Sequence, residues 1–222
     1  MAPSLLSADF ADLGGAIRAA EAGGAGAFHL DVMDGHFVPN ISFGPALVHA
    51  VRRRTRLPLD IHLMIAEPGR YAATFREAGG DTLVFHAEAT TDPSATVREL
   101  RATGAAVGVA IRPETPYAAI EGLVASLDQV LIMSVHPGFS GQRFLPEALP
   151  KLREARRHLD RLGSAADLSV DGGITPDTAG AAAAAGATLY VCGNSAFVGG
   201  SVPGNLARLR AAIEDGAQRE VR

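Results

Sequence analysis

The chain has 222 residues, of which 47% are hydrophobic and 20% are charged, and its formal net charge is −4 at pH 7. This composition is typical of a globular protein, and the length suits one large domain. The mildly acidic balance argues against a nucleic-acid-binding face, and the absence of a run of eighteen apolar residues argues against a membrane span.

Short apolar runs recur along the chain, and four of them follow a stretch that has helical character and ends in glycine. The glycines are Gly23, Gly79, Gly104 and Gly186. Glycine ends helices because it adopts the left-handed conformation without a steric penalty. The runs are rich in β-branched and aromatic residues and therefore predict buried strands. In chain order, we expect strands at residues 2–6, 27–31, 59–63, 82–86, 106–111, 129–134, 167–171 and 188–192.

Prolines mark the starts of most predicted helices, because the first helical position does not need the missing N–H. They are Pro45, Pro68, Pro93, Pro116, Pro146, Pro176 and Pro203. Asp92, Thr115 and Thr175 each precede one of these prolines and are predicted N-caps. One more helix is expected near residues 9–22, with Asp9 as its cap.

Strand and helix thus alternate eight times, in units of about 28 residues, close to the size of a strand–helix–strand module. This pattern predicts a single-domain α/β fold over residues 1–215, a (β/α)8 TIM barrel, with a doubly wound open sheet as the alternative. Residues 216–222 are expected to form a charged, frayed tail.

Polar side chains gather after the predicted strands, where both α/β architectures place their functional sites. His29 and Asp31 share one face of the second strand, His62 follows on the third, and Asp171 ends the seventh. If that face lines the barrel, the four side chains converge. Two imidazoles and two carboxylates suit one divalent ion such as Zn, Fe, Mn or Co.

Two alternatives to this metal site stay open at this point. A histidine at the end of a barrel strand can also be a hydrogen-bonded core residue. In addition, His86 and Glu88 form a second pair with the same spacing, and spacing does not decide between the two clusters.

Glycine-rich turns follow three neighbouring strands, which favours a phosphate-binding type of barrel. Glycine allows phosphate oxygens to approach backbone N–H groups closely. The alternative is that these glycines only form tight turns. The residues concerned are Gly138, Phe139, Ser140, Gly141, Gly172, Gly173, Gly193 and Asn194.

Several blocks together resemble the ribulose-phosphate 3-epimerase family. The blocks keep the family's order and cover the chain from residue 2 to about residue 200. They are residues 2–10, 29–40 (HLDVMDGHFVPN), 60–65, 133–142, 171–174 and 193–195. The twelve-residue block is the most specific of them.

The resemblance implies a role for each candidate residue. It implies that His29, Asp31, His62 and Asp171 hold the metal, and that Asp31 and Asp171 are the catalytic acid–base pair. The implied substrate-binding residues are Ser7, Met33, His62, Met64, Met133, Asp171 and the eight residues of the glycine-rich turns. In the family, residues at the positions of His86 and Glu88 do not bind the metal directly.

The implied reaction is inversion of C3 in a ketose phosphate, chiefly D-ribulose 5-phosphate to D-xylulose 5-phosphate. Two carboxylates on opposite sides supply two bases, and a divalent ion stabilises the charge of the enediolate. His136, Ser140 and Asn194 depart from the usual family pattern near the sugar and phosphate ends, so D-allulose 6-phosphate is the alternative substrate. Residues 137–146 are expected to close over the substrate as a lid.

Other classes of protein fit this sequence less well. Lys151 is the only lysine and falls within a predicted helix, which disfavours a Schiff-base aldolase or a lysine-dependent decarboxylase. A metal-dependent barrel hydrolase and a non-catalytic sugar-phosphate binding protein stay as alternatives. The single cysteine, Cys192, and the lack of a secretory signal favour a cytoplasmic protein, and the resemblance implies a homo-oligomer.

Overall fold

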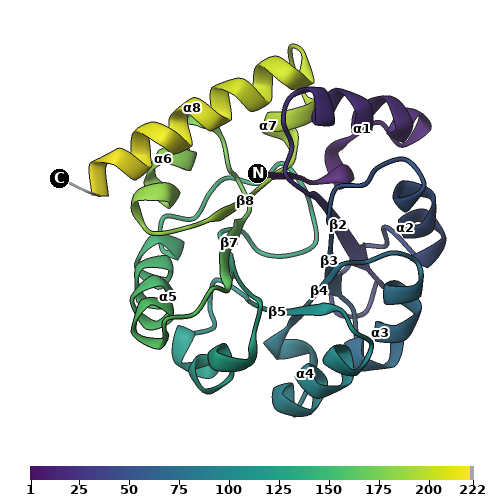
Figure 1. Ribbon diagram of the computed structural model, residues 1–222, viewed down its shortest axis with the longest axis vertical. Helices are drawn as coiled ribbons and strands as arrows, with labels where there is room; N and C mark the ends of the chain where they lie inside the picture. Colours follow the sequence, from purple (N-terminus) through teal and green to yellow (C-terminus); the bar gives the residue numbers. More distant parts are fainter. Residues whose placement is uncertain (221–222) are drawn as a thin grey trace.

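The computed structural model describes residues 1–220, which form eight parallel strands curled into a barrel (Figure 1). The strands are β1 (Ala2–Pro3), β2 (Phe28–Met33), β3 (Leu59–Met64), β4 (Thr82–His86), β5 (Ala106–Ile111), β6 (Gln129–Met133), β7 (Asp167–Asp171) and β8 (Leu189–Cys192). Successive strands pair from β2 to β8, and β8 pairs with β1. A parallel bridge between Ser4 and His29 joins the remaining edges. The predicted (β/α)8 barrel is confirmed.

Helices surround the barrel, and the prolines mark most of their starts as predicted (Figure 1). They are α1 (Leu13–Ala22), α2 (Pro45–Arg52), α3 (Pro68–Glu77), α4 (Pro93–Ala102), α5 (Ala148–Leu162), α6 (Pro176–Ala184), α7 (Asn194–Phe197) and α8 (Val202–Glu220). Three short 3₁₀ helices, η1 (Leu5–Ser7), η2 (Phe10–Asp12) and η3 (Ala87–Ala89), lie in the loops. Within residues 1–220, each helix is too short or too polar to cross a lipid bilayer.

The segment after Pro116 differs from its prediction. It forms two 3₁₀ helices, η4 (Tyr117–Ala119) and η5 (Glu121–Ser126), in place of an α-helix. The buried residues Tyr117 and Ile120 are three positions apart, which matches a turn of three residues, and Gly122 disfavours a longer α-helix. Thr115 is therefore not a helix cap, and its hydroxyl donates a hydrogen bond to Glu88 instead.

Two of the predicted caps differ in their outcome. Asp92 caps α4 as expected, because its carboxylate accepts a hydrogen bond from the Ala95 N–H at 2.9 Å. In contrast, α1 begins three residues later than predicted. Its cap is Asp12, which accepts from Gly15 N–H at 2.9 Å, whereas Asp9 caps the short η2 helix before it.

Strand alternation separates the core from the interior of the barrel. On β3, Leu59, Ile61 and Leu63 belong to the apolar core between the strands and the helices, while Asp60 and His62 lie on the opposite face. The same alternation on β2 directs His29 and Asp31 inward. The barrel interior therefore holds polar groups, which is the arrangement that the sequence pattern predicts.

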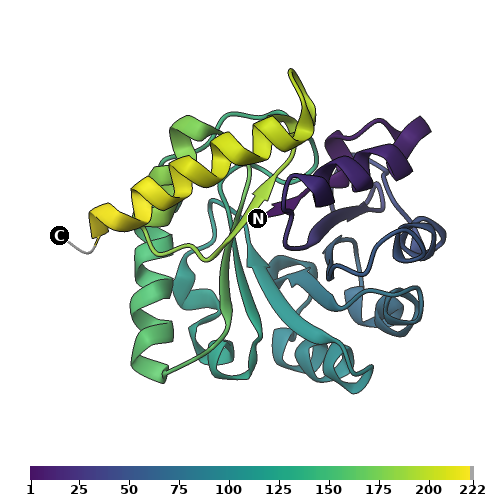
Figure 2. The same ribbon diagram turned by 45° about the horizontal axis from the view of Figure 1, so that its top comes forward.

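The long helix α8 packs across α6 (Figure 2). Two glycines, Gly180 and Gly216, meet where the two helices touch. Gly216 is buried, and a Cβ atom there would lie 2.2 Å from the backbone oxygen of Gly180. The predicted start of the tail at residue 216 thus falls inside α8, which runs to Glu220. Residues 221–222 of that tail lie outside the described residues.

Replacing Gly216 with Ala is expected to destabilise the protein by about 1–3 kcal/mol, because the added methyl group overpacks this contact. For a chain of this length, each kcal/mol lowers the melting temperature by about 2–4 °C, which calorimetry would detect. Gly122→Ala is the matched control, since a Cβ at Gly122 meets no atom within 4 Å. Equal melting temperatures for Gly216→Ala and the unmodified protein would contradict the prediction.

Candidate active site

Four side chains with metal-binding donors meet inside the barrel near the carboxyl ends of β2, β3 and β7. The donor atoms of His29, Asp31, His62 and Asp171 all lie within 4.8 Å of one another. His62 Nδ1 is 3.2 Å from Asp31 Oδ1 and 3.6 Å from Asp171 Oδ2. His29 Nε2 is 3.3 Å from Asp31 Oδ1 and 3.9 Å from Asp171 Oδ2.

This cluster fits a divalent cation by both its donors and its burial. His29 and His62 are fully buried, and Asp31 is 5% exposed. Two carboxylates in such a place are costly unless a positive charge compensates them. Imidazole nitrogens and carboxylate oxygens are ligands that Zn, Fe, Mn and Co share. The four residues can therefore hold a metal ion, and they do not select one metal among these.

The surroundings of the two carboxyl groups shift their pKa values in opposite directions. Burial would raise the pKa of Asp31, but His29 and His62 outweigh it and hold this pKa far below its usual value. Burial and the negative charge of Asp31 raise the pKa of Asp171 to about 6. The pKa of His29 is well above its usual value, because Asp31 and Asp60 outweigh the opposing effect of burial.

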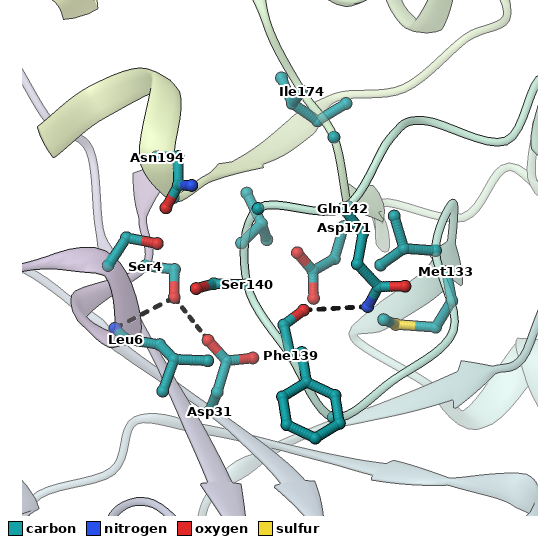
Figure 3. Close-up of a pocket in the computed structure, with 18 of the residues that line it drawn as sticks. Ser4, Leu6, Asp31, Met133, Phe139, Ser140, Gln142, Asp171, Ile174 and Asn194 are labelled. Carbon is teal, nitrogen blue, oxygen red and sulfur yellow. Dashed lines mark hydrogen bonds between the residues drawn. The ribbon is translucent and has the colours of Figure 1, made fainter. Parts of the chain in front are cut away.

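A cavity of about 160 Å³ opens above the cluster. Figure 3 shows the side chains of Asp31 and Asp171 pointing into this cavity. Met133, which also lines it, is the register partner of Asp171 on the neighbouring strand β6. Ser4 also lines the cavity, and its hydroxyl donates a hydrogen bond of 2.5 Å to Asp31 Oδ2. The cavity thus brings both carboxyl groups within reach of one small molecule.

Almost all of the residues predicted to bind the substrate line this cavity. They are Ser7, Met33, Met64, Met133, Gly138, Phe139, Ser140, Gly141, Asp171, Gly172, Gly173, Gly193 and Asn194. The exception is His62, which has no exposed surface and does not line the cavity. Ser7 Oγ is buried and has no hydrogen-bond partner among residues 1–220, so it can bind a polar group in the cavity.

The predicted lid segment, residues 137–146, runs over the cavity without a helix or strand of its own. Gln142 stabilises the turn from inside, because its amide donates to the carbonyl groups of His136 and Phe139 at 2.6 and 3.0 Å. Asn40 donates to the Gly138 carbonyl at 2.7 Å from the loop after β2. These bonds hold the segment across the mouth of the cavity, and its closing over a substrate stays a prediction.

The second candidate cluster lies directly behind the first. His86 Nε2 is 2.9 Å from His62 Nε2, and His86 Nδ1 is 3.2 Å from Glu88 Oε2. Burial lowers the pKa of His86 to about 4, whereas hydrogen bonds from His86, Thr115 and Arg112 overcome burial and lower the pKa of Glu88 to about 2. The two residues therefore adjoin the four-residue cluster and do not form a separate centre.

Sequence reasoning missed several polar groups around the site, among them Ser4, Gln142 and Asp60. Asp60 lies two residues before His62, on the inward face of β3, and this spacing is a signal that could have found it. Ser4 and Gln142 have no such signal, because their partners Asp31 and the 136–139 turn are reached only through the fold.

Comparisons with known proteins agree with these features. A model of the Ribulose-phosphate 3 epimerase family matches residues 1–197. The Bacillus subtilis ribulose-phosphate 3-epimerase is 49% identical over 198 residues, covering 89% of this chain and 91% of that protein. The Escherichia coli enzyme of the same name is 41% identical, covering 89% and 88%.

Among solved structures, the fold is shared with more distant enzymes. The 3-keto-L-gulonate-6-phosphate decarboxylase from Vibrio cholerae superposes with a TM-score of 0.71 at 16% sequence identity, covering 96% of both chains. A 3-hexulose-6-phosphate synthase gives a TM-score of 0.66 at 18% identity, covering 96% of this chain and 99% of that one. At such identities the likeness concerns the fold alone.

Proposed function

The chain belongs to the ribulose-phosphate 3-epimerase family, and we propose that it interconverts D-ribulose 5-phosphate and D-xylulose 5-phosphate by inverting C3. It is thus a carbohydrate epimerase of the isomerase class. The observation that carries the proposal is the pair of carboxyl groups, Asp31 and Asp171, that face one cavity above a cluster able to hold a metal.

In the proposed reaction, the two carboxyl groups move a proton on opposite faces of the substrate. The carbon that is inverted lies next to the ketone, so that its proton is acidic enough for a carboxylate to remove. One aspartate takes the proton from C3, and the other returns a proton to the opposite face. Ser4 holds Asp31 by its short hydrogen bond, which orients the carboxylate toward the cavity.

His29, Asp31, His62 and Asp171 would hold the metal ion. When bound, a divalent ion supplies Lewis-acid stabilisation of the negative charge that develops on the substrate oxygens. Met33, Met64 and Met133 line the sugar end of the cavity with apolar, non-nucleophilic groups that exclude water. Elemental analysis of the purified protein would identify the metal.

The substrate phosphate is proposed to bind at the glycine-rich turns after β6, β7 and β8. Gly172 and Gly173 have φ values of 120° and 62°, a region that favours glycine. Because these residues lack side chains, their backbone can approach an anion closely. The homo-oligomeric state implied by the family and the cytoplasmic location favoured by the cysteine content stay predictions.

Deuterium exchange in heavy water tests the function directly. With D-ribulose 5-phosphate, we expect deuterium at C3, accumulation of D-xylulose 5-phosphate, and no release of inorganic phosphate. D-allulose 6-phosphate, supplied in parallel, tests the alternative substrate, to which His136, Ser140 and Asn194 point. Release of phosphate would indicate a hydrolase, and binding without exchange would indicate a sugar-phosphate binding protein.

Gly173→Ala is expected to raise the KM for D-ribulose 5-phosphate by about tenfold or more, equivalent to about 1.4 kcal/mol of lost binding. A Cβ at Gly173 would lie 2.3 Å from the Phe144 backbone nitrogen, so that the turn has to shift. Steady-state kinetics would measure the change. Gly199→Ala, also at positive φ but with no atom within 4 Å of its Cβ, is the control for backbone strain. An equal KM in both variants would argue against phosphate binding at this turn.

A further inference from the structure

Each histidine of the candidate metal centre directs one ring nitrogen to the centre and the other to a second buried polar group. For His29, the outer nitrogen is Nδ1, which lies 2.8 Å from Asp60 Oδ2. Asp60 is 3% exposed and also accepts a hydrogen bond of 3.3 Å from the amide of Gln129. Its other oxygen, Oδ1, is buried and has no hydrogen-bond partner in the described part of the chain, so the hydrogen bonds of this carboxylate go to His29 and Gln129 through Oδ2.

For His62, the outer nitrogen is Nε2, and two residues in series, His86 and Glu88, lie behind it. His62 Nε2 lies 2.9 Å from His86 Nε2, and His86 Nδ1 lies 3.2 Å from Glu88 Oε2. Glu88 Oε1 accepts hydrogen bonds from the Arg112 N–H, at 2.8 Å, and from the Thr115 hydroxyl. A continuous chain of contacts therefore leads from the centre to the loop after β5.

The hydrogen bonds at Glu88 determine which atom donates and which accepts in the series His62–His86–Glu88. Glu88 already accepts two hydrogen bonds at Oε1, so it is also an acceptor toward His86, and His86 Nδ1 carries the proton. His86 Nε2 is then an acceptor, and the neighbouring His62 Nε2 is the donor. With its proton on Nε2, His62 presents the lone pair of Nδ1 to the centre. His29 Nδ1 carries the proton, because it donates to the carboxylate of Asp60. His29 Nε2 therefore presents its lone pair to the centre.

We propose that Asp60 and the His86–Glu88 pair are positioning residues that fix the tautomer and orientation of the two histidines, so that His29 binds the metal through Nε2 and His62 through Nδ1. Carboxylates behind histidine ligands have this effect in metal sites generally, and they also raise the basicity of the ligand. The proposal rests on the metal centre assigned under the proposed function, and it adds three residues that do not contact the substrate cavity.

The chain's only lysine, Lys151, holds in place the loop after β5 to which Glu88 binds. Lys151 Nζ donates to the carbonyl groups of Arg112, Pro113 and Thr115, at 2.9, 3.0 and 2.6 Å. These residues form the loop whose N–H and hydroxyl groups bind Glu88. The lysine that sequence reasoning excluded from Schiff-base chemistry therefore has a structural task, which is to fix the loop that anchors Glu88.

Metal affinity tests the proposal without any activity measurement. The probe is Zn²⁺ alone, titrated against a chromophoric chelator, with the unmodified protein and with Asp60→Asn, His86→Phe and Glu88→Gln. We expect Asp60→Asn and His86→Phe to bind Zn²⁺ about 10–100-fold more weakly, and Glu88→Gln to show a smaller loss in the same direction. Asp81→Asn is the matched control, since Asp81 pairs with Arg52 and accepts from Leu59 N–H at the opposite end of β3.

Imidazole nitrogen shifts of the ¹⁵N-histidine-labelled, Zn²⁺-loaded protein supply a second readout that needs no variant. We expect His86 to carry its proton on Nδ1 and His62 to carry its proton on Nε2. A proton on Nε2 of His86 would overturn the proposal. Zn²⁺ affinities of Asp60→Asn and His86→Phe within twofold of the unmodified protein, or an equal loss in Asp81→Asn, would overturn it too. Failure of the unmodified protein to bind Zn²⁺ would instead contradict the metal centre itself.

Discussion

Replacing Asp31 or Asp171 with Asn is expected to lower the turnover number for epimerisation by about 10³-fold or more, the scale of a lost general acid or base. Asparagine keeps the size of the side chain but takes up no proton, and each aspartate faces the same cavity. Because the reaction needs one group on each face of C3, either change alone stops inversion. Steady-state kinetics with D-ribulose 5-phosphate would measure the loss.

The matched control for this prediction is Asp167→Asn on the same strand as Asp171. Asp167 begins β7 at the opposite end of the barrel, where its carboxylate accepts a hydrogen bond from the Thr188 hydroxyl at 2.9 Å. We expect this variant to keep its turnover number within about twofold, because Asp167 does not line the cavity within the described residues. It should also stay folded, since surface substitutions usually change stability by no more than ~0.5 kcal/mol. Circular dichroism would verify that all three variants are folded. A folded Asp31→Asn or Asp171→Asn protein with normal turnover would refute the two-base mechanism.

Local rules were enough to predict the barrel, because its strands and helices are marked in the sequence itself. Gly79, Gly104 and Gly186 lie just after helices and have positive φ, and Pro45, Pro68, Pro93 and Pro176 begin helices. The period of two along β2 and β3 then placed His29, Asp31 and His62 on one inward face. The rules failed after Pro116, where the packing of Tyr117 and Ile120 selects 3₁₀ turns over an α-helix.

Contacts between strands were beyond the reach of these rules. Ser4 contacts Asp31 where the two edges of the barrel meet, and no local pattern in the sequence predicts a contact between residues 27 positions apart. From the sequence alone, His86 belongs to a competing cluster, because its spacing to Glu88 repeats that of His29 to Asp31. Only the parallel register of β3 and β4 turns it into the partner of His62. Residue types and spacing thus define which groups enter the barrel, whereas register decides which of them touch.

Removing the metal with a chelator is expected to abolish epimerisation and to lower the melting temperature by about 5–10 °C. The second figure follows from about 2.7 kcal/mol of stabilisation when the metal is at 100 times its Kd, at about 2–4 °C per kcal/mol for a chain of this length. Without a cation, Asp31 and Asp171 face each other among buried groups. Assays and calorimetry before and after chelation, and after adding back Zn²⁺, Mn²⁺, Co²⁺ or Fe²⁺, would measure both effects.

Two histidine variants separate the loss of the metal from a general effect of the chelator. His62→Gln is expected to behave like the chelated protein, whereas His49→Gln, which changes an exposed histidine of α2, is expected to keep both its metal and its activity. Full activity of a chelated, metal-free protein would contradict the role of the ion. In that case the positive charge between the two aspartates would have to come from His29, because Asp31 and Asp60 already favour its protonated form. The His29→Gln variant would then lose activity, whereas the chelated protein would keep it. Chelation thus gives opposite results for a charge supplied by the metal and a charge supplied by His29.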